Sequence, residues 1–167
     1  MELYILRHGE AGKRLQAGSK DSERALTIMG QEEVQQIARA LARLGVQLDF
    51  IATSPLKRAY QTAVIVAKEL NIKKGNVQEW NELKPEGKRQ DLYRKLVQFN
   101  LESSIMIVGH EPNLSSAVAE IVFGDGIGGI VLKKAGLARL DVISFQPRIK
   151  GCLKWLLTPK QLRKIAK

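Results

Sequence analysis

The stretch that organises this chain is Glu2-Leu3-Tyr4-Ile5-Leu6-Arg7-His8-Gly9-Glu10-Ala11. Its apolar run, Leu3 to Leu6, has the length and the bulky side chains of a buried β-strand. Charged and polar residues follow at once, and placing them at the end of a buried strand is costly unless that end reaches a functional surface. In a parallel α/β sheet this surface is the carboxyl edge, where ligands bind.

The three residues after this strand are suited to holding an anion. Arg7 carries a planar guanidinium that fits phosphate or carboxylate oxygens. His8 is largely neutral at pH 7, so its imidazole can act as a nucleophile or a base. Gly9 allows the backbone to turn and to approach a ligand closely. The sequence therefore predicts a ligand site at the end of the first strand.

The composition is that of one globular domain, residues 1–167, with a basic surface. The 27 Lys and Arg residues outnumber the 17 Asp and Glu residues, which gives a formal charge of +10. This charge favours anionic partners, although a solvated lysine-rich surface explains it equally well. We expect no membrane span and no secretory signal, and with a single cysteine the chain is expected to be cytoplasmic.

Apolar runs and helical patterns alternate along the first two-thirds of the chain. The expected strands are residues 3–6, 48–53, 77–80 and 105–108. One expected helix follows Thr27 as its N-cap, and a second follows Ser54 as its N-cap, with Pro55 in its first turn. Two more helices are expected in the region of Leu92 to Phe99 and over residues 113–123. Residues 12–24 and 124–129 are expected to be loops. We therefore predict an α/β fold, in which a mostly parallel central sheet has helices on both faces in three layers.

The last third of the chain has a different pattern. Residues 130–132, 137–145 and 151–157 are predicted to be strands of a meander, and a short helix is predicted within residues 159–167. Cys152 lies in an apolar run and is expected to be in the core. Although residues 124–129 match the pattern G-x-G-x-x-G, a helix precedes them and a strand follows, which is the reverse of a dinucleotide site.

The two histidines of the chain, His8 and His110, occur in the same context. Each follows a strongly apolar strand and is adjacent to a glycine, and Arg7 and Arg58 are placed at similar strand ends. If the strands are parallel, all four side chains emerge at one sheet edge. Two guanidinium groups and imidazoles can stabilise a transferring phosphoryl group, and one imidazole can attack it, without a metal.

Three motifs, in order, give a resemblance to a known family. They are Arg7-His8-Gly9, then Ser54-Pro55-Leu56-Lys57-Arg58-Ala59-Tyr60-Gln61-Thr62-Ala63, and then Gly109-His110. This set resembles the histidine phosphatase superfamily, and the small size and the late Leu153-Lys154-Trp155 are most similar to the SixA phosphohistidine phosphatases. The resemblance implies a phosphoglycerate mutase-like fold, no cofactor and no metal. By position, His8 would be the nucleophile, and Arg7, Arg58 and His110 would form the phosphate pocket.

The resemblance leaves the general acid open. One family pattern places a carboxylate shortly after the third strand, which is Glu82 here, and another branch places it directly after the second histidine, which is Glu111. Glu10 is a further candidate because it is close to His8 in sequence. Glu82 is the first choice among the three, and the alternative for each is a solvated or helix-capping glutamate.

The implied function is metal-independent dephosphorylation through a phosphohistidine intermediate. Without the long insertions of larger members, the site is expected to be open, which favours phosphohistidine on a signalling or phosphotransfer protein as the substrate. A small-molecule phosphomonoesterase or a phosphomutase of the same fold is the alternative enzyme. A basic module that binds nucleic acid or acidic proteins is the alternative from another class, and it leaves the paired histidines unexplained.

Overall fold

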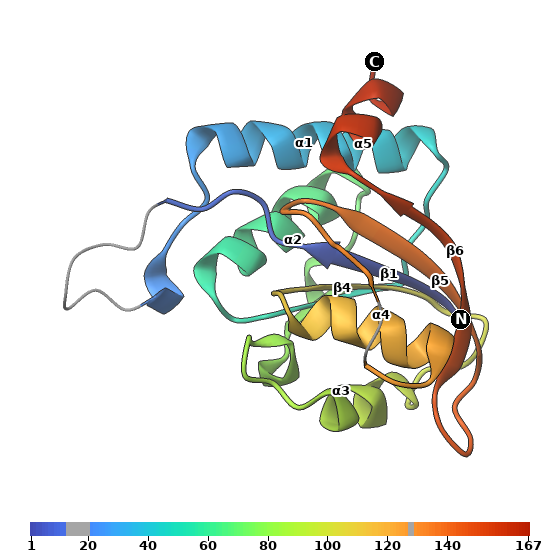
Figure 1. Cartoon of the computed structure of the whole chain (residues 1–167). Helices are drawn as coiled ribbons and strands as arrows, with labels where there is room; N and C mark the ends of the chain where they lie inside the picture. Colours follow the sequence, from blue (N-terminus) through green and yellow to red (C-terminus); the bar gives the residue numbers. More distant parts are fainter. Residues whose placement is uncertain (13–20, 127–128) are drawn as a thin grey trace.

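The computed structural model describes residues 1–12, 21–126 and 129–167, and one six-stranded sheet runs through them (Figure 1). The strands are β1 (Glu2–Arg7), β2 (Phe50–Thr53), β3 (Val77–Glu79), β4 (Ser104–Gly109), β5 (Leu137–Ser144) and β6 (Lys150–Leu157). The helices are α1 (Ile28–Arg43), α2 (Lys57–Glu69), α3 (Arg89–Leu96), α4 (Asn113–Phe123) and α5 (Pro159–Ile165), with 3-10 turns η1 (Asp21–Glu23), η2 (Lys74–Asn76) and η3 (Asn81–Leu83).

The strand order is β3-β2-β4-β1-β5-β6. The first four strands of this order run parallel, whereas β5 is antiparallel to β1 and β6 is antiparallel to β5. The predicted mostly parallel sheet is therefore confirmed. In the β1–β4 register Arg7 lies beside Gly109, so the two glycine-adjacent histidines that follow these strands emerge together.

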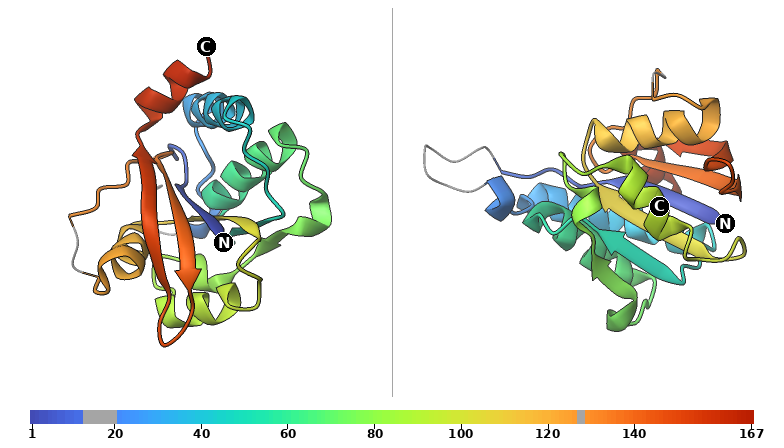
Figure 2. Two further views of the ribbon diagram at one scale, coloured as in Figure 1. Left: turned by 90° about the vertical axis from the view of Figure 1, so that its right-hand side faces the viewer. Right: turned by 90° about the horizontal axis from the view of Figure 1, so that it is seen from below.

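Helices cover both faces of the sheet, as predicted (Figures 1 and 2). Successive residues of a strand point to opposite faces, so a strand buried on both faces is apolar throughout. In β1, Leu3 and Ile5 pack into the layer with α3 and α4, whereas Tyr4 and Leu6 pack into the layer with α1, α2 and α5. The unbroken apolar run in the sequence has this physical cause.

Local sequence features explain most helix ends. Thr27 caps α1 as predicted, because its Oγ1 accepts a hydrogen bond from the Gly30 amide at 2.9 Å. The chain then leaves α1 through Gly45, whose φ of 70° lies in the left-handed region that glycine adopts readily. A capping box formed by Thr158 and Gln161 begins α5, which confirms the predicted C-terminal helix.

The prediction for the start of α2 was wrong. The helix begins at Lys57, its N-cap residue is Leu56, and no side chain caps it. Ser54 lies three residues before the helix, with its hydroxyl against the His110 ring, and Pro55 also precedes the first turn. A serine followed by a proline is typical of a helix start, and this pattern does not show that the hydroxyl contacts His110 instead.

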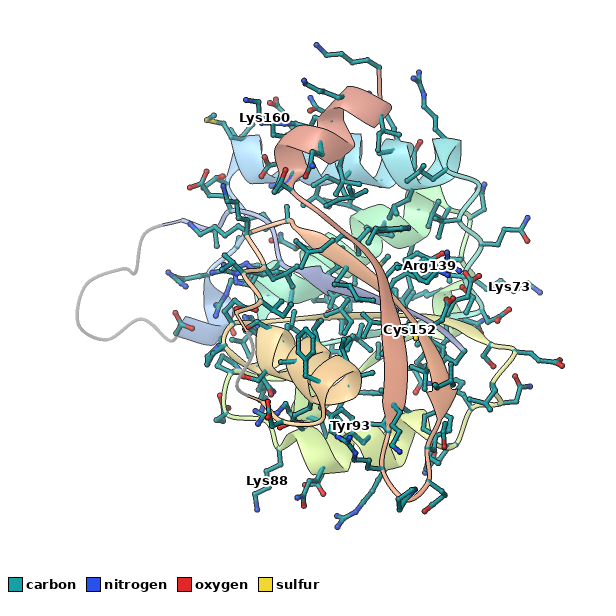
Figure 3. All side chains as sticks on the ribbon, turned by 45° about the vertical axis from the view of Figure 1, so that its right-hand side comes forward. Lys73, Lys88, Tyr93, Arg139, Cys152 and Lys160 are labelled. Atoms are coloured by element: carbon teal, nitrogen blue, oxygen red, sulfur yellow. The ribbon has the colours of Figure 1, made fainter. Side chains whose placement is uncertain are left out.

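Two predictions for the last third of the chain were also wrong. Residues 130–132 are not a strand, because this segment folds over the end of β1, where the Leu132 carbonyl accepts a hydrogen bond from Arg7 Nη1 at 2.9 Å. Cys152 is exposed rather than in the core, because it lies on β6, the edge strand of the sheet (Figure 3).

Two of the predicted loops extend beyond the described residues. Of the segments 12–24 and 124–129, positions 13–20 and 127–128 are not described, and these include part of the glycine-rich pattern. In the rest of the chain, no helix combines the length and the apolar character that a membrane crossing requires.

Candidate active site

The parallel pairing of β1 and β4 places His8 and His110 side by side. Their ring centroids are 4.9 Å apart with an angle of 53° between the planes, and the His8 amide donates to the Gly109 carbonyl at 3.2 Å. Both side chains are buried, with 7% of His8 and 2% of His110 exposed. The predicted meeting of the two histidines at the carboxyl edge of the sheet is therefore observed.

The contacts of His8 determine which of its nitrogens is available. Nδ1 lies 2.7 Å from the Gly9 carbonyl, and because a carbonyl only accepts, Nδ1 carries the proton and donates it. Nε2 then retains its lone pair, which accepts a hydrogen bond from Arg58 Nε at 3.3 Å. The backbone thus fixes the tautomer in which Nε2, and not Nδ1, is unprotonated.

Arg58 stands in the first turn of α2 and is 4% exposed. Its two terminal nitrogens donate to Asp21, with Nη1 2.9 Å from the backbone carbonyl and Nη2 3.0 Å from Oδ2. Burial lowers the pKa of Arg58, and the Asp21 carboxylate acts in the opposite direction. Asp21 was missed by the sequence analysis because it lies in a segment without a recognisable pattern.

Residues of the second motif fasten α2 to the loop after β1. The Gly9 amide donates to Thr62 Oγ1 at 3.1 Å, and the Thr62 hydroxyl donates to the Arg58 carbonyl at 2.8 Å. Gln61 Oε1 accepts a hydrogen bond from the Leu26 amide at 2.8 Å. A Cβ atom at Gly9 would lie 2.6 Å from a methyl group of Val34, so glycine permits this close approach.

Arg7 and His110 complete the group of four predicted side chains. Arg7 Nη1 is held by the Leu132 carbonyl, while Arg7 Nε is buried and has no hydrogen-bond partner among the described residues. His110 Nε2 lies 2.9 Å from Ser54 Oγ, and its Nδ1 is likewise buried without a described partner. Buried polar atoms are usually paired, so each of these two exceptions calls for an explanation.

Burial and neighbouring cations keep both imidazoles neutral. Desolvation lowers the pKa of His8 to about 4, together with the charges of Arg58, Arg7 and Lys134, although the hydrogen bond to Gly9 acts in the opposite direction. Desolvation also lowers the pKa of His110 to about 3, with further contributions from its arginine and histidine neighbours. At pH 7 the lone pair of His8 Nε2 is therefore available for attack.

These lowered pKa values predict acid destabilisation. Around and below pH 6.5 the unfolded chain binds protons at His8 and His110, whereas the folded chain does not. The free energy of unfolding therefore falls as the pH decreases from about 7 to 5. We expect a loss of about 1–2 kcal/mol per histidine over this interval. Urea unfolding at both pH values measures it, and His110→Asn should show a shallower loss. An unchanged pH dependence in this variant would contradict the assignment.

The Glu82 carboxylate is engaged in an ion pair. Its Oε2 lies 2.8 Å from Lys95 Nζ, and 21% of the Glu82 side chain is exposed. Partial burial acts to raise the pKa of Glu82, but hydrogen bonds from Lys95 and from its own backbone, with the lysine charge, lower it overall. In this arrangement Glu82 is ionised at pH 7, which is unfavourable for a proton donor.

The two rival carboxylates also have identifiable contacts. Glu111 Oε1 accepts a hydrogen bond from the Ser115 amide at 3.1 Å, so it satisfies a donor at the start of α4. The Glu10 side chain is half exposed, and its carboxylate lies 3.7 Å from Lys134 Nζ. Glu111 thus has the helix-capping contact that the sequence analysis considered as its alternative role.

A buried asparagine holds the Glu82 segment against α4. Asn113 is 4% exposed, and its Nδ2 donates to the carbonyls of Gly87 at 3.0 Å and of Glu82 and Lys84 at 3.4 Å each. A Cβ atom at Gly87 would lie 2.1 Å from the Glu82 carbonyl, so this turn requires glycine. The position of Glu82 is therefore fixed by backbone contacts.

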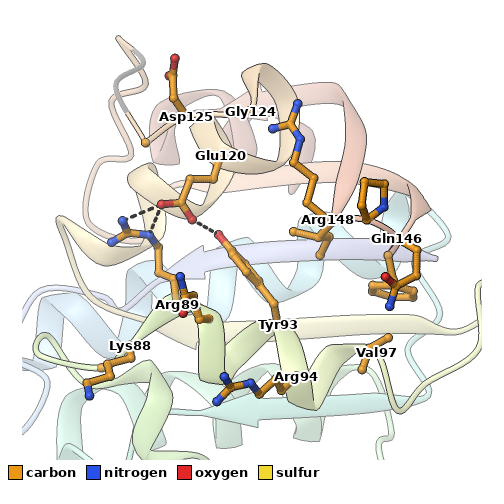
Figure 4. Close-up of a pocket in the computed structure, with 16 residues that line it drawn as sticks. Lys88, Arg89, Tyr93, Arg94, Val97, Glu120, Gly124, Asp125, Gln146 and Arg148 are labelled. Carbon is orange, nitrogen blue, oxygen red and sulfur yellow. Dashed lines mark hydrogen bonds and ion pairs between the residues drawn. The ribbon is translucent and has the colours of Figure 1, made fainter.

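A cavity of about 770 Å³ lies between α3, α4 and the β5–β6 turn (Figure 4). Glu120 accepts hydrogen bonds there from Arg89 at 2.6 and 2.8 Å and from the Tyr93 hydroxyl at 2.6 Å. None of the four residues of the candidate site lines this cavity. Its central charged groups satisfy one another and join α3 to α4.

Comparison with known proteins shows a family and solved structures that this chain is similar to. The model of the histidine phosphatase superfamily (branch 1) matches residues 3–98. Phosphohistidine phosphatase SixA of Escherichia coli (strain K12) is 28% identical over 98% of this chain and 97% of its own length, and an uncharacterized protein of Picosynechococcus sp. is 35% identical over 97% and 99%. A solved structure of the protein histidine phosphatase SixA complexed with tungstate has a TM-score of 0.85 and 26% identity, covering 97% of this chain and 99% of that one.

Proposed function

Because this chain belongs to the histidine phosphatase superfamily, we propose that it dephosphorylates phosphohistidine on a signalling or phosphotransfer protein. The similarity to SixA supports phosphatase activity. The observation that carries the proposal is the unprotonated Nε2 of His8, which contacts Arg58 Nε and lies beside Arg7 and His110 at the sheet edge. One domain, residues 1–167, carries all of these groups.

The proposed reaction has two displacements at phosphorus. His8 Nε2 attacks the phosphoryl group in line as the bond from phosphorus to the substrate nitrogen breaks, which leaves a phosphoryl group on Nε2. Water then attacks phosphorus, the bond to Nε2 breaks, and phosphate leaves. Arg7, Arg58 and His110 stabilise the oxygens in both steps with groups that are fixed before the reaction begins.

The environment of the carboxylates favours phosphohistidine over an alkyl phosphate. An alkoxide is a strongly basic leaving group and needs a proton donor, whereas an imidazole leaves readily once its ring is protonated. Glu82 is ionised and paired with Lys95, and Glu111 binds a helix amide. A site in which Glu82 stays ionised is sufficient for the easier leaving group.

Phosphate release from a substrate panel in the presence of EDTA tests the proposal. The panel contains a phosphohistidine protein, phosphoserine and phosphotyrosine peptides, and sugar phosphates. We expect the phosphohistidine protein to have the highest kcat/KM and activity to persist in EDTA, because the described residues contain no cluster suited to a metal ion and the site supplies its own cations. Preference for a sugar phosphate would identify a small-molecule phosphomonoesterase, and restoration by magnesium after a loss in EDTA would overturn the metal-free mechanism.

Glu82→Gln distinguishes a proton donor from a structural carboxylate. If Glu82 stays ionised during turnover, the substitution should change kcat/KM by less than about threefold for phosphohistidine and for nitrophenyl phosphate, whose leaving groups need little protonation. Steady-state kinetics on these substrates and on an alkyl phosphate measures this. A loss confined to the alkyl phosphate would instead establish Glu82 as the acid. The same comparison on Glu10→Gln and Glu111→Gln tests the two rival candidates for the acid.

A further inference from the structure

A second recess, of about 480 Å³, adjoins the candidate site at Arg7. Side chains from the end of β1, the segment before β5, and α5 line it. Its cations are Arg7, Lys133, Lys134, Lys160 and Arg163. Neither His8 nor Arg58 nor His110 lines it, so the recess extends the site rather than repeating it.

The positive charge of this recess is only partly balanced. Its one carboxylate, Glu33, lies 3.4 Å from Arg163, and Lys134 lies 3.7 Å from the half-exposed Glu10. Within the described part of the chain, Lys133 and Lys160 form no ion pair. A concave surface lined mostly by positive charges attracts anions and raises their local concentration.

The backbone fixes this recess next to the proposed nucleophile. The Ala135 amide donates to the carbonyls of Arg7 and His8 at 3.1 and 3.0 Å, and the Gly136 amide donates to the Lys133 carbonyl at 2.7 Å. The turn that carries Lys133 and Lys134 is therefore bonded directly to the end of β1. An anion in the recess would therefore lie on the Arg7 side of the candidate site.

We propose that this recess docks an acidic segment of the phosphorylated protein substrate next to its phosphohistidine. The inference rests on the proposed function and names the surface by which the enzyme recognises its substrate. The Lys133, Lys134, Lys160 and Arg163 side chains are exposed and come from two separate segments, which suits an extended acidic surface more than an enclosed small ligand. Among the described residues, no aromatic side chain lines the recess, so these residues offer no stacking platform for nucleic-acid bases.

Charge reversal at two exposed lysines of the recess tests the proposal. The rim variant is Lys133→Glu combined with Lys160→Glu, and the matched control is Lys73→Glu combined with Lys74→Glu. The control lysines are exposed and lie between α2 and β3, at the opposite, amino edge of the sheet (Figure 3). Both variants change the net charge equally. The substrates are two synthetic phosphohistidine peptides, one flanked by Asp and Glu and one by Ser and Gly, together with nitrophenyl phosphate.

The expected result is a loss of about tenfold in kcat/KM for the acidic peptide in the rim variant alone, mostly through KM. Turnover of the neutral peptide and of nitrophenyl phosphate should stay within about twofold of wild type. An equal loss in the control variant, or on all three substrates, would overturn the proposal, and so would no loss on any of them.

A binding measurement separates this inference from the proposed function. Fluorescence anisotropy with the unphosphorylated acidic peptide should show weaker binding to the rim variant and unchanged binding to the control. If neither phosphohistidine peptide is hydrolysed, the proposed function fails while this binding difference still reports on the recess. Equally weakened binding of a single-stranded RNA of matched charge would assign the recess to polyanions in general and overturn the acidic-protein proposal.

Discussion

His8→Ala is expected to abolish turnover, with a loss of at least about 10⁴-fold in kcat. The reason is chemical: the variant lacks the proposed nucleophile, the unprotonated Nε2 of His8 that contacts Arg58 Nε. Wild-type enzyme quenched during turnover should carry a phosphate that is labile in acid and stable in base, which is the behaviour of a phosphoramidate. Mass spectrometry should locate this phosphate on the peptide that contains His8.

The control for this prediction is a measurement that shows whether His8→Ala is folded. His8 is buried beside His110, so the variant is compared with wild type by urea unfolding at pH 7. The variant should remain folded, because removing a desolvated imidazole relieves part of the cost of its burial. A folded His8→Ala protein with normal turnover, or labelled wild-type enzyme with phosphate on another residue, would refute the covalent mechanism.

The sequence predicts the sheet well because burial on both faces requires continuous apolar runs. The β1 and β4 strands are such runs, and their parallel pairing follows from the helices between them. Once both strands were assigned, the meeting of His8 and His110 was a consequence of topology. The location of these two side chains was therefore predictable without any knowledge of the loops.

The contacts that complete the site depend on loop paths, which periodicity does not encode. Asp21 reaches Arg58 from a 3-10 turn, and the Ser54 hydroxyl meets His110 although its sequence context is that of a helix cap. The segment before β5 was predicted to be a strand from its apolar residues, yet it folds back over β1 and brings Lys134 near His8. Each of these contacts joins residues far apart in the chain.

The ion pairs of the carboxylates could not be predicted from the sequence either. Sequence position placed Glu82 after the third strand, where the structure has it, but did not show that Lys95 of α3 would pair with it at 2.8 Å. The protonation state of a carboxyl group depends on such neighbours, because a cation nearby favours the ionised form. Whether Glu82 donates a proton is therefore tested by the kinetics of Glu82→Gln and cannot be predicted from the sequence pattern.

Arg58→Ala is expected to lower kcat/KM by about two orders of magnitude or more while the protein stays folded. Arg58 is buried, and its Nε donates to Nε2 of His8, the proposed nucleophile, at 3.3 Å. Arg58→Lys keeps the charge but loses the planar fork, so it should recover only part of the activity.

Arg24→Ala is the matched control for the loss of a cation at Asp21. Arg24 Nε lies 2.9 Å from Asp21 Oδ1, whereas Arg58 binds the other oxygen of the same carboxylate, and only Arg58 of the two also donates to His8. If Arg58 acts on the transferring charge, Arg24→Ala should stay within about threefold of wild type, and both variants should keep Tm within a few degrees. Equal losses of activity in the two variants, or a collapse of Tm in Arg58→Ala, would instead mean that Arg58 serves to anchor Asp21.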